Sequence, residues 1–179
     1  MNKIYSLVNY CDLKLLYLIN SRIKSNILDK FVPAITNLGS AAFTLFFSLS
    51  LIFFGRDRVK TAGIESLFAL TTSSILVTYL KKKFTRPRPY WVIKDVNSFN
   101  LNLKDYSFPS GHTTAAFSIA SVLSINFPSL MMVFTSIALI VGLSRIYLAV
   151  HFPTDVLIGI IIGITFGIFN CSVIYPYFI

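Results

Sequence analysis

The sequence predicts an all-α, polytopic bundle of membrane helices: about five transmembrane helices preceded by an N-terminal amphipathic helix, six helices in total. Two observations predict this class. Hydrophobic residues make up 55% of the 179 residues and only 13% are charged, whereas soluble domains carry roughly a quarter charged residues. Several apolar runs are also long enough to cross a bilayer, which takes about 20 residues. Run length therefore disfavours the alternative, a soluble α-helical protein with an unusually apolar core.

Residues 3–20 have the period of an amphipathic helix. Asp12 and Lys14 interrupt its apolar residues, and its length is marginal for a span. We expect an interfacial helix followed by a polar connector up to residue 30. A short extra transmembrane helix is the alternative, and nothing here resembles a removable signal peptide. The apolar stripe carries Ile4, Leu7, Val8, Cys11, Leu15 and Leu18, and the opposite face carries Ser6, Asn9 and Asn20.

Residues 31–179 are expected to form the transmembrane part of one domain that covers residues 1–179. The third predicted helix is short, because about 16 residues at ~1.5 Å each reach ~24 Å, less than the ~30 Å hydrocarbon core. We therefore expect its Ser110–His112 end to lie below the membrane surface. The five predicted helices cover residues 31–54, 61–80, 111–127, 129–150 and 154–175.

Three glycines lie four residues apart on the last predicted helix: Gly159, Gly163 and Gly167. Stripes of small residues let membrane helices approach closely. We expect this face to point into the bundle together with Asp155.

Three polar segments fall on the same side of the membrane when the crossings are counted. The helix at 31–54 leaves that side and the helix at 61–80 returns to it. The next pair of helices leaves and returns again. Residues 81–89, 109–112 and 144–155 are therefore expected to meet at one membrane face, and a site assembled from three segments is the simplest explanation.

The net charge of +9 does not indicate nucleic acid binding, because the basic residues lie in short connectors between apolar runs. That placement suits lipid headgroups or phosphate ligands. Cys11 and Cys171 lie near opposite ends of the chain without metal or redox spacing, so both are interpreted as small apolar residues. The expected partners are the bilayer and a lipid phosphate, with no nucleic acid and no indication of oligomeric state.

The segment Ser110-Gly111-His112 begins the third predicted helix. Serine is a good N-cap, the free N–H groups of a helix start bind anions, and Gly111 lets a ligand approach the backbone. His112 adds a proton donor beside a phosphate held there. Taken alone, the segment is more often a simple N-cap with a satisfied histidine.

Lys81 and Arg88 are seven residues apart, at a helix end and in a proline-flanked extended segment. Arginine binds phosphate by a bidentate fork and lysine as a point charge. Taken alone, a basic cluster at a helix end more often contacts lipid headgroups or solvent.

Arg145, His151 and Asp155 lie within a dozen residues of one another in an apolar setting, where charged groups are costly. Arg145 needs an anion, and Asp155 is the only acidic residue near it in sequence. Asp155 follows His151 by four residues across Pro153, a spacing that lets the carboxylate accept from one ring nitrogen and leave the other free to attack. A purely structural His–Asp pair is the alternative.

Together the three segments predict phosphoryl transfer through a covalent phosphohistidine. His151 attacks phosphorus, Asp155 orients it, and His112 protonates the leaving oxygen and later activates water. Positive side chains and the helix start stabilise the equatorial oxygens. The chain lacks a carboxylate cluster suited to magnesium, so no metal and no cofactor are expected. The predicted phosphate-binding residues are Lys81, Arg88, Ser110, Gly111 and Arg145.

These segments resemble the signature of the type 2 phosphatidic acid phosphatase superfamily, which reads Lys-x6-Arg-Pro, then Pro-Ser-Gly-His, then Ser-Arg-x5-His-x3-Asp. Here they are Lys81 to Pro89, Pro109 to His112, and Ser144 to Asp155, in the same order and without departure. The resemblance implies metal-independent dephosphorylation with the residue roles given above. Similar membrane proteins act on undecaprenyl pyrophosphate, phosphatidylglycerol phosphate, phosphatidic acid or lipid A, and the sequence selects none of them.

The resemblance also implies a bacterial plasma-membrane protein with its site on the extracytoplasmic face. Charge counting disagrees, because ten Lys and Arg residues between 21 and 110 lie on the side of the site and only three, between 56 and 60, lie on the other. Two other functions remain open. One is a phosphotransferase that passes phosphate from lipid to lipid, and the other is a non-catalytic lipid-phosphate binding or transport protein.

Overall fold

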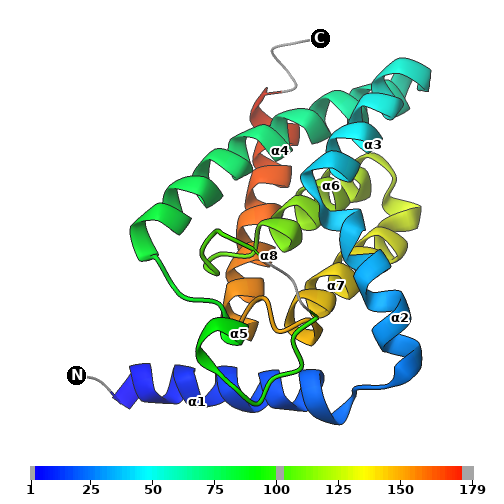
Figure 1. Ribbon diagram of the computed structural model, residues 1–179. Coiled ribbons are helices and arrows are strands. Elements are labelled where there is room, and N and C mark those ends of the chain that lie inside the picture. The colour runs from blue at the N-terminus through cyan, green and yellow to red at the C-terminus, as the bar shows by residue number, and fades with distance from the viewer. Residues whose placement is uncertain (1–2, 100–102, 175–179) are drawn as a thin grey trace.

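The protein folds into a bundle of α-helices with one helix laid across its end (Figure 1). The computed structural model describes residues 3–99 and 103–174, and no strand occurs among them. The α-helices are α1 (Lys3–Tyr17), α2 (Asn26–Ile35), α3 (Ala41–Phe54), α4 (Asp57–Phe84), α5 (Pro89–Val92), α6 (Gly111–Asn126), α7 (Met131–Tyr147) and α8 (Pro153–Phe169). The π-helical turns are Leu18–Arg22 and Asn170–Ile174, and the 3₁₀ turns are Thr36–Gly39 and Pro128–Leu130.

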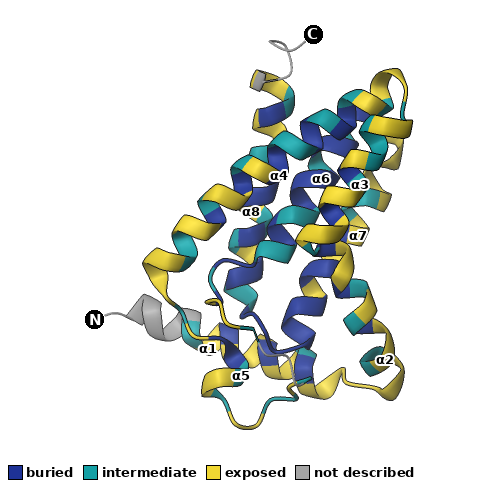
Figure 2. Ribbon diagram, turned by 45° about the horizontal axis from the view of Figure 1, so that its top comes forward, coloured by how far each residue is buried: buried dark blue, intermediate teal, exposed yellow. Residues whose placement is uncertain are grey.

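Helix α6 lies at the centre of the bundle and packs against α4, α7 and α8. Figure 2 shows the buried residues concentrated on α6 and on the sides of its neighbours that face it. Apolar residues such as Ala69 on α4 and Val122 on α6 form one part of this core. The N-terminal residues of α6, which carry the Ser-Gly-His segment, are thereby held inside the protein.

The glycine stripe of α8 packs against α6, as predicted. A Cβ added at Gly159, Gly163 or Gly167 would lie 2.9, 2.7 or 3.0 Å from the backbone oxygen of Ser110, Thr114 or Ser118, respectively. These oxygens recur every four residues on α6, in step with the glycines. Because these glycines have no side chain, α8 can approach the backbone of α6 this closely.

The apolar run 31–54 is not one helix, contrary to the prediction. It is a pair of helical segments, with α2 and the turn Thr36–Gly39 in the first and α3 in the second, bent by 55° at Ser40. Ser40 is the N-cap of the new helix α3, and its hydroxyl accepts a hydrogen bond from the Phe43 N–H at 3.2 Å. Gly39 lies so close to α6 that a Cβ there would be 2.8 Å from the His112 oxygen. The bend therefore brings the chain against the start of α6.

The expected count of about five spans is not confirmed. Three helices are long and apolar enough to cross a membrane, or four if the bent pair forms one span, among the residues that the structure describes. Helix α6, with 16 residues, is not one of them. Helix α7 also ends at Tyr147 rather than at residue 150, and the predicted helix 154–175 ends outside the described residues.

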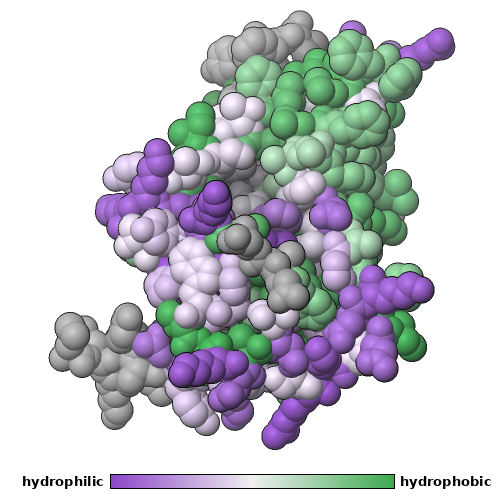
Figure 3. Space-filling model, in the orientation of Figure 1, coloured by the Kyte–Doolittle hydropathy of each residue, from purple (hydrophilic) through white to green (hydrophobic). Residues whose placement is uncertain are grey.

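Helix α1 lies across the end of the bundle, next to the start of α8 (Figure 1). Its Asp12, Leu16 and the following Asn20 are buried against the protein, whereas Cys11 and Leu15 point outward. Figure 3 shows hydrophilic side chains concentrated in the lower half of the view, which includes this end, and mostly apolar ones over the upper half. The side chains expected on the same stripe at Ile4, Leu7 and Val8, and on the opposite face at Ser6, lie outside the described part.

We predict that Gly163→Leu destabilises the bundle. The new side chain would overlap the backbone of α6, and overpacking of this kind costs about 1–3 kcal/mol or more. Thermal unfolding in detergent should show a lower melting temperature. Ile161→Leu, on the exposed side of the same helix, is the matched control and should melt like the wild type. Equal melting of Gly163→Leu and the wild type would contradict the packing argument.

Candidate active site

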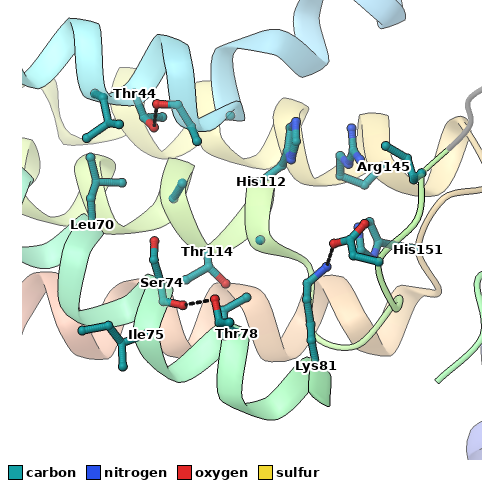
Figure 4. A pocket seen from close by; sticks show the side chains of 18 of the residues that line it. Thr44, Leu70, Ser74, Ile75, Thr78, Lys81, His112, Thr114, Arg145 and His151 are labelled. Carbon is teal, nitrogen blue, oxygen red and sulfur yellow. Dashed lines mark hydrogen bonds and ion pairs between the residues drawn. The ribbon is translucent and has the colours of Figure 1, made fainter. Parts of the chain in front are cut away.

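A cavity of about 730 Å³ lies between α3, α4 and α6 and ends at the turn between α7 and α8. Figure 4 shows Lys81, His112, Arg145 and His151 gathered at one end of it. Thr44, Leu70, Ile75 and other residues of α3 and α4 line the other end. The cavity thus joins a cationic end to a mostly apolar one. The structure brings side chains of all three predicted segments together there.

Lys81 and Arg88 reach the cavity from the end of α4 and from the segment after it. Thr85 caps α4 in a left-handed conformation, with φ of 42°, and its N–H donates to the Lys81 oxygen. This turns the chain so that Arg88 points inward and is only 2% exposed. Arg88 Nη1 donates to the Val150 oxygen at 2.8 Å, which ties it to the α7–α8 turn.

Asp105 is a member of the site that sequence reasoning missed. Its carboxylate bridges the two cations, with Oδ2 2.5 Å from Lys81 Nζ and Oδ1 2.6 Å from Arg88 Nη2. Burial alone would raise the pKa of this carboxyl, but the hydrogen bonds and charges of Lys81 and Arg88 outweigh it and lower the pKa to about 2. An ionised carboxylate therefore occupies part of the anion site. In the sequence, the only indication of such a carboxylate was the excess of Lys and Arg residues in the predicted site.

The three residues of the Ser-Gly-His segment take different positions at the start of α6. Ser110 caps α6, with its hydroxyl bonded to Thr113 Oγ1 at 2.8 Å, and it does not line the cavity. Gly111 does line the cavity, and a Cβ there would have only Val77 within 4 Å, at 3.8 Å. The space in front of this backbone is open to a ligand. His112 follows in the first turn of α6 and borders the same space.

Arg145 projects into the cavity from the last turn of α7 and is buried. Asp155, the acidic residue nearest to Arg145 in sequence, pairs with Arg86. Arg145 Nη1 instead donates to Thr36 Oγ1 at 2.6 Å, and the bend between α2 and α3 supplies that threonine. Arg145 Nε has no hydrogen-bond partner within the described residues. A buried guanidinium with an unused donor suits an anionic ligand.

His151 is fixed by the turn between α7 and α8. Ala149 adopts a left-handed conformation, with φ of 52°, and the N–H groups of Val150 and His151 both donate to the Arg145 oxygen. The ring nitrogen Nε2 lies 3.3 Å from Arg88 Nη1. A guanidinium can only donate, so Nε2 is the acceptor and the proton of the neutral ring lies on Nδ1.

The charge state of His151 follows from its burial. Burial lowers its pKa to about 3, a change that Asp155 opposes and the cations Arg145 and Arg88 reinforce. The ring is therefore neutral near pH 7, with a lone pair on Nε2. This is the form in which histidine acts as a nucleophile.

Asp155 lies behind His151, away from the cavity, and is fully buried. Its Oδ2 is 3.7 Å from His151 Nδ1, longer than a hydrogen bond, and it accepts from the Phe152 N–H at 2.8 Å and from the Ser107 hydroxyl. Its Oδ1 accepts from Arg86 Nη1 at 2.6 Å. Arg86 and Ser107 are further residues that sequence reasoning missed. They hold the carboxylate at the Nδ1 side of the ring.

Metal ligands do not gather at this site. Within residues 3–99 and 103–174, no three His, Cys, Asp or Glu side chains come close enough to hold a metal ion. The positive charge at the end of the cavity comes from Lys81, Arg88 and Arg145, which we name the cation cage. The arrangement can hold a multiply charged anion next to a neutral imidazole that carries a lone pair on Nε2.

A family model described as the PAP2 superfamily matches residues 62–177, well over half of the chain. Undecaprenyl-diphosphatase BcrC of Bacillus subtilis is 30% identical over 80% of this chain and 73% of its own length. A lipid A 1-phosphatase of Rhizobium johnstonii is 27% identical over 78% of this chain, which spans 65% of that relative.

Two solved structures are similar throughout the bundle. The crystal structure of Aquifex aeolicus LpxE superimposes with a TM-score of 0.78 at 36% identity, covering 89% of this chain and 94% of that one. A PAP2-type phosphatidylglycerolphosphate phosphatase from Bacillus subtilis gives a TM-score of 0.74 at 29% identity, covering 96% and 86%. The bundle is therefore shared with membrane proteins of this type.

We predict that Asp105→Asn tightens the binding of inorganic phosphate. The carboxylate competes with phosphate for Lys81 and Arg88, and removing its charge should lower the Kd by about 5- to 10-fold, equivalent to about 1 kcal/mol. Isothermal titration calorimetry of the purified protein measures this directly. Asp95→Asn, an exposed position in the same loop, is the control. Equal or weaker binding by Asp105→Asn would show that the carboxylate supports the anion site rather than competing for it.

Proposed function

The chain belongs to the PAP2 superfamily, and on that premise we propose that it is an integral-membrane phosphatase that removes a terminal phosphate from a lipid phosphate or pyrophosphate. One observation carries the proposal: the cation cage and two histidines lie at one end of a cavity whose other end is apolar. The candidate substrates are undecaprenyl pyrophosphate, phosphatidylglycerol phosphate and phosphatidic acid. A phosphate fits the cationic end and a hydrocarbon chain the apolar end.

The position of the apolar end supports a lipid substrate. Residues of α3 and α4 such as Leu45 and Ile75 line it. Both are also exposed on the surface of the bundle, in the part that bears apolar side chains. In a bilayer this surface faces hydrocarbon. A lipid whose headgroup enters the cavity can thus leave its chains in the membrane, without burial in a closed pocket.

The proposed reaction has two steps. His151 Nε2 attacks phosphorus, forming an N–P bond as the P–O bond to the lipid breaks, and His112 gives its proton to the departing oxygen. His112 then removes a proton from water, whose oxygen attacks the phosphohistidine and releases inorganic phosphate. Asp155 stabilises the His151 ring as it becomes positive, and the cation cage stabilises the charge on the equatorial oxygens. The backbone at Gly111 binds the same oxygens.

Lipid A is the second candidate substrate. It is favoured by the 36% identity to Aquifex aeolicus LpxE and by the similarity to the Rhizobium lipid A 1-phosphatase. Its glycosyl phosphate would use the same cage and the same histidines. The two candidates differ in the group outside the cage, so a substrate panel separates them.

We further propose that the protein lies in a bacterial plasma membrane, with the site on the extracytoplasmic face and α1 on the surface of the bilayer. The exposed Cys11 and Leu15 of α1 suit an interfacial position. Four of the ten cations counted on the site's side are ion-paired, namely Lys24, Lys81, Arg86 and Arg88. Because these cations have internal partners, the charge bias against an outward site is smaller than the sequence indicates.

We predict that His151→Ala lowers phosphate release by at least ~10³-fold, because no other group can form the covalent intermediate. The assay uses undecaprenyl pyrophosphate, phosphatidylglycerol phosphate, phosphatidic acid and lipid A in detergent without added metal. Wild-type protein should also carry an acid-labile phosphoryl group after rapid mixing, and His151→Ala should not. Full activity of His151→Ala on every lipid would end the catalytic interpretation.

We predict that a single cysteine at Asp95→Cys, in a chain with Cys11→Ser and Cys171→Ala, reacts with a membrane-impermeant maleimide in intact cells. Arg58→Cys, in the first turn of α4 at the other end of the bundle, should react only after lysis. Labelling is read by gel shift. The reverse pattern would place the site in the cytoplasm.

A further inference from the structure

Asp12, on the helix that crosses the end of the bundle, is connected to Asp155 through Arg86. Asp12 is only 1% exposed. Its Oδ2 accepts from Arg86 Nη2 at 2.7 Å and from the Thr154 hydroxyl at 2.6 Å, and its Oδ1 accepts from the Thr154 N–H at 2.9 Å. Both oxygens are therefore fixed by donors from other segments of the chain.

Arg86 bridges the two carboxylates. Its Nη1 donates to Asp155 Oδ1 at 2.6 Å and to the Thr154 hydroxyl at 2.8 Å, and its Cζ lies 4.0 Å from the centre of the Phe152 ring. Contacts on three sides leave the planar guanidinium little freedom. The position of Asp155 Oδ1 is thus set by a residue that is itself held by Asp12.

The charges of this group matter as much as its geometry. A lone Arg86 beside Asp155 would form a closed ion pair and reduce the negative charge that Asp155 presents to His151 Nδ1. With Asp12 on its other side, Arg86 is shared, and the three groups together carry one net negative charge. Asp155 is the member of the three that faces His151, so that charge lies where the ring becomes positive during attack.

Asp12 is not needed merely to hold α1 against the bundle, because other residues of α1 and the turn after it already do so. Leu16 packs into a buried cluster with Ile146, Phe152 and Val156. Asn20 Nδ2 donates to the Tyr147 oxygen at 2.7 Å, and its Oδ1 accepts from the Asn97 N–H. Buried ion pairs are poor stabilisers compared with apolar contacts.

We propose that Asp12 and Arg86 are positioning residues for the phosphatase reaction, which fix the place and the charge of Asp155 behind His151. The inference rests on the proposed function, in which Asp155 orients His151. It gives α1 a part in catalysis, because α1 supplies a carboxylate to the active site from outside the three sequence segments. Neither residue touches the cavity, so neither contacts substrate.

The test is phosphate release by Asp12→Asn, Arg86→Gln and the double variant, on the lipid of the four-member panel that the wild type hydrolyses fastest. We expect kcat to fall by about 10-fold in Asp12→Asn and by about 100-fold in Arg86→Gln, with KM within about twofold of wild type. The double variant should match Arg86→Gln alone, because Asp12 acts through Arg86. The proposal would be overturned if the kcat losses of the two single variants multiplied in the double variant, or if the variants changed KM rather than kcat.

Leu16→Ala is the matched control, since it weakens the docking of α1 one turn from Asp12 without removing an ion pair. It should lower the melting temperature at least as much as Asp12→Asn does, yet keep kcat within about twofold of wild type. If Leu16→Ala lowers kcat as much as Asp12→Asn does, docking alone explains the effect and the proposal fails.

A second readout does not depend on activity. The chain has two histidines, so ¹⁵N-histidine labelling gives two sets of ring signals, which His112→Gln assigns. Asp12→Asn and Arg86→Gln should move the Nδ1 signal of His151 and leave that of His112 in place, while Leu16→Ala should move neither. An unmoved His151 signal overturns the proposal. If the wild type released no phosphate from any lipid, the proposed function would fail, and these spectra would still decide whether Asp12 acts on His151.

Discussion

The constraint on which the rest of the structure depends is the placement of three cations at the end of a cavity in an otherwise apolar bundle. Arg88 and Arg145 are buried, and Lys81 is half-buried. Cations in such surroundings are costly unless each has a partner. The protein meets most of this need with its own groups: Asp105 for Lys81 and Arg88, and Thr36 for Arg145. The buried Arg145 Nε has no hydrogen-bond partner among the described residues. With one carboxylate for three cations, the site keeps a net positive charge and is open to an anion.

The fold brings segments that are far apart in the sequence together at the cation cage. The glycine stripe lets α8 lie against α6, which fixes the helix start that carries Gly111 and His112 relative to the start of α8. The bend between α2 and α3 adds Thr36 beside Arg145. The left-handed turn at Ala149 places the ring of His151 against Arg88. The bend between α2 and α3 and the left-handed turn at Ala149 thus both lie next to the cation cage.

The sequence alone predicts the helical class, the convergence of three segments and six of the residues at the cationic end of the cavity, because motif spacing and apolar run length are local properties. It does not predict the break within 31–54, since an apolar run shows no sign of a bend that tertiary contacts impose. It also misses Asp12, Arg86 and Asp105. Their roles depend on pairing across 17 to 74 residues, and neither periodicity nor motif spacing reports contacts of that kind.

Asp105, which pairs with the cation cage, and Asp155, which lies behind His151, differ in exposure and in what holds them. The Asp105 side chain is 56% exposed and lies on a loop, whereas that of Asp155 is fully buried and held by Arg86, Ser107 and the backbone of Phe152. A phosphate can displace the first by moving a loop side chain into water, but it cannot displace the second without unpacking α8. Asp105 can therefore give way to a bound phosphate, whereas Asp155 stays in place behind His151.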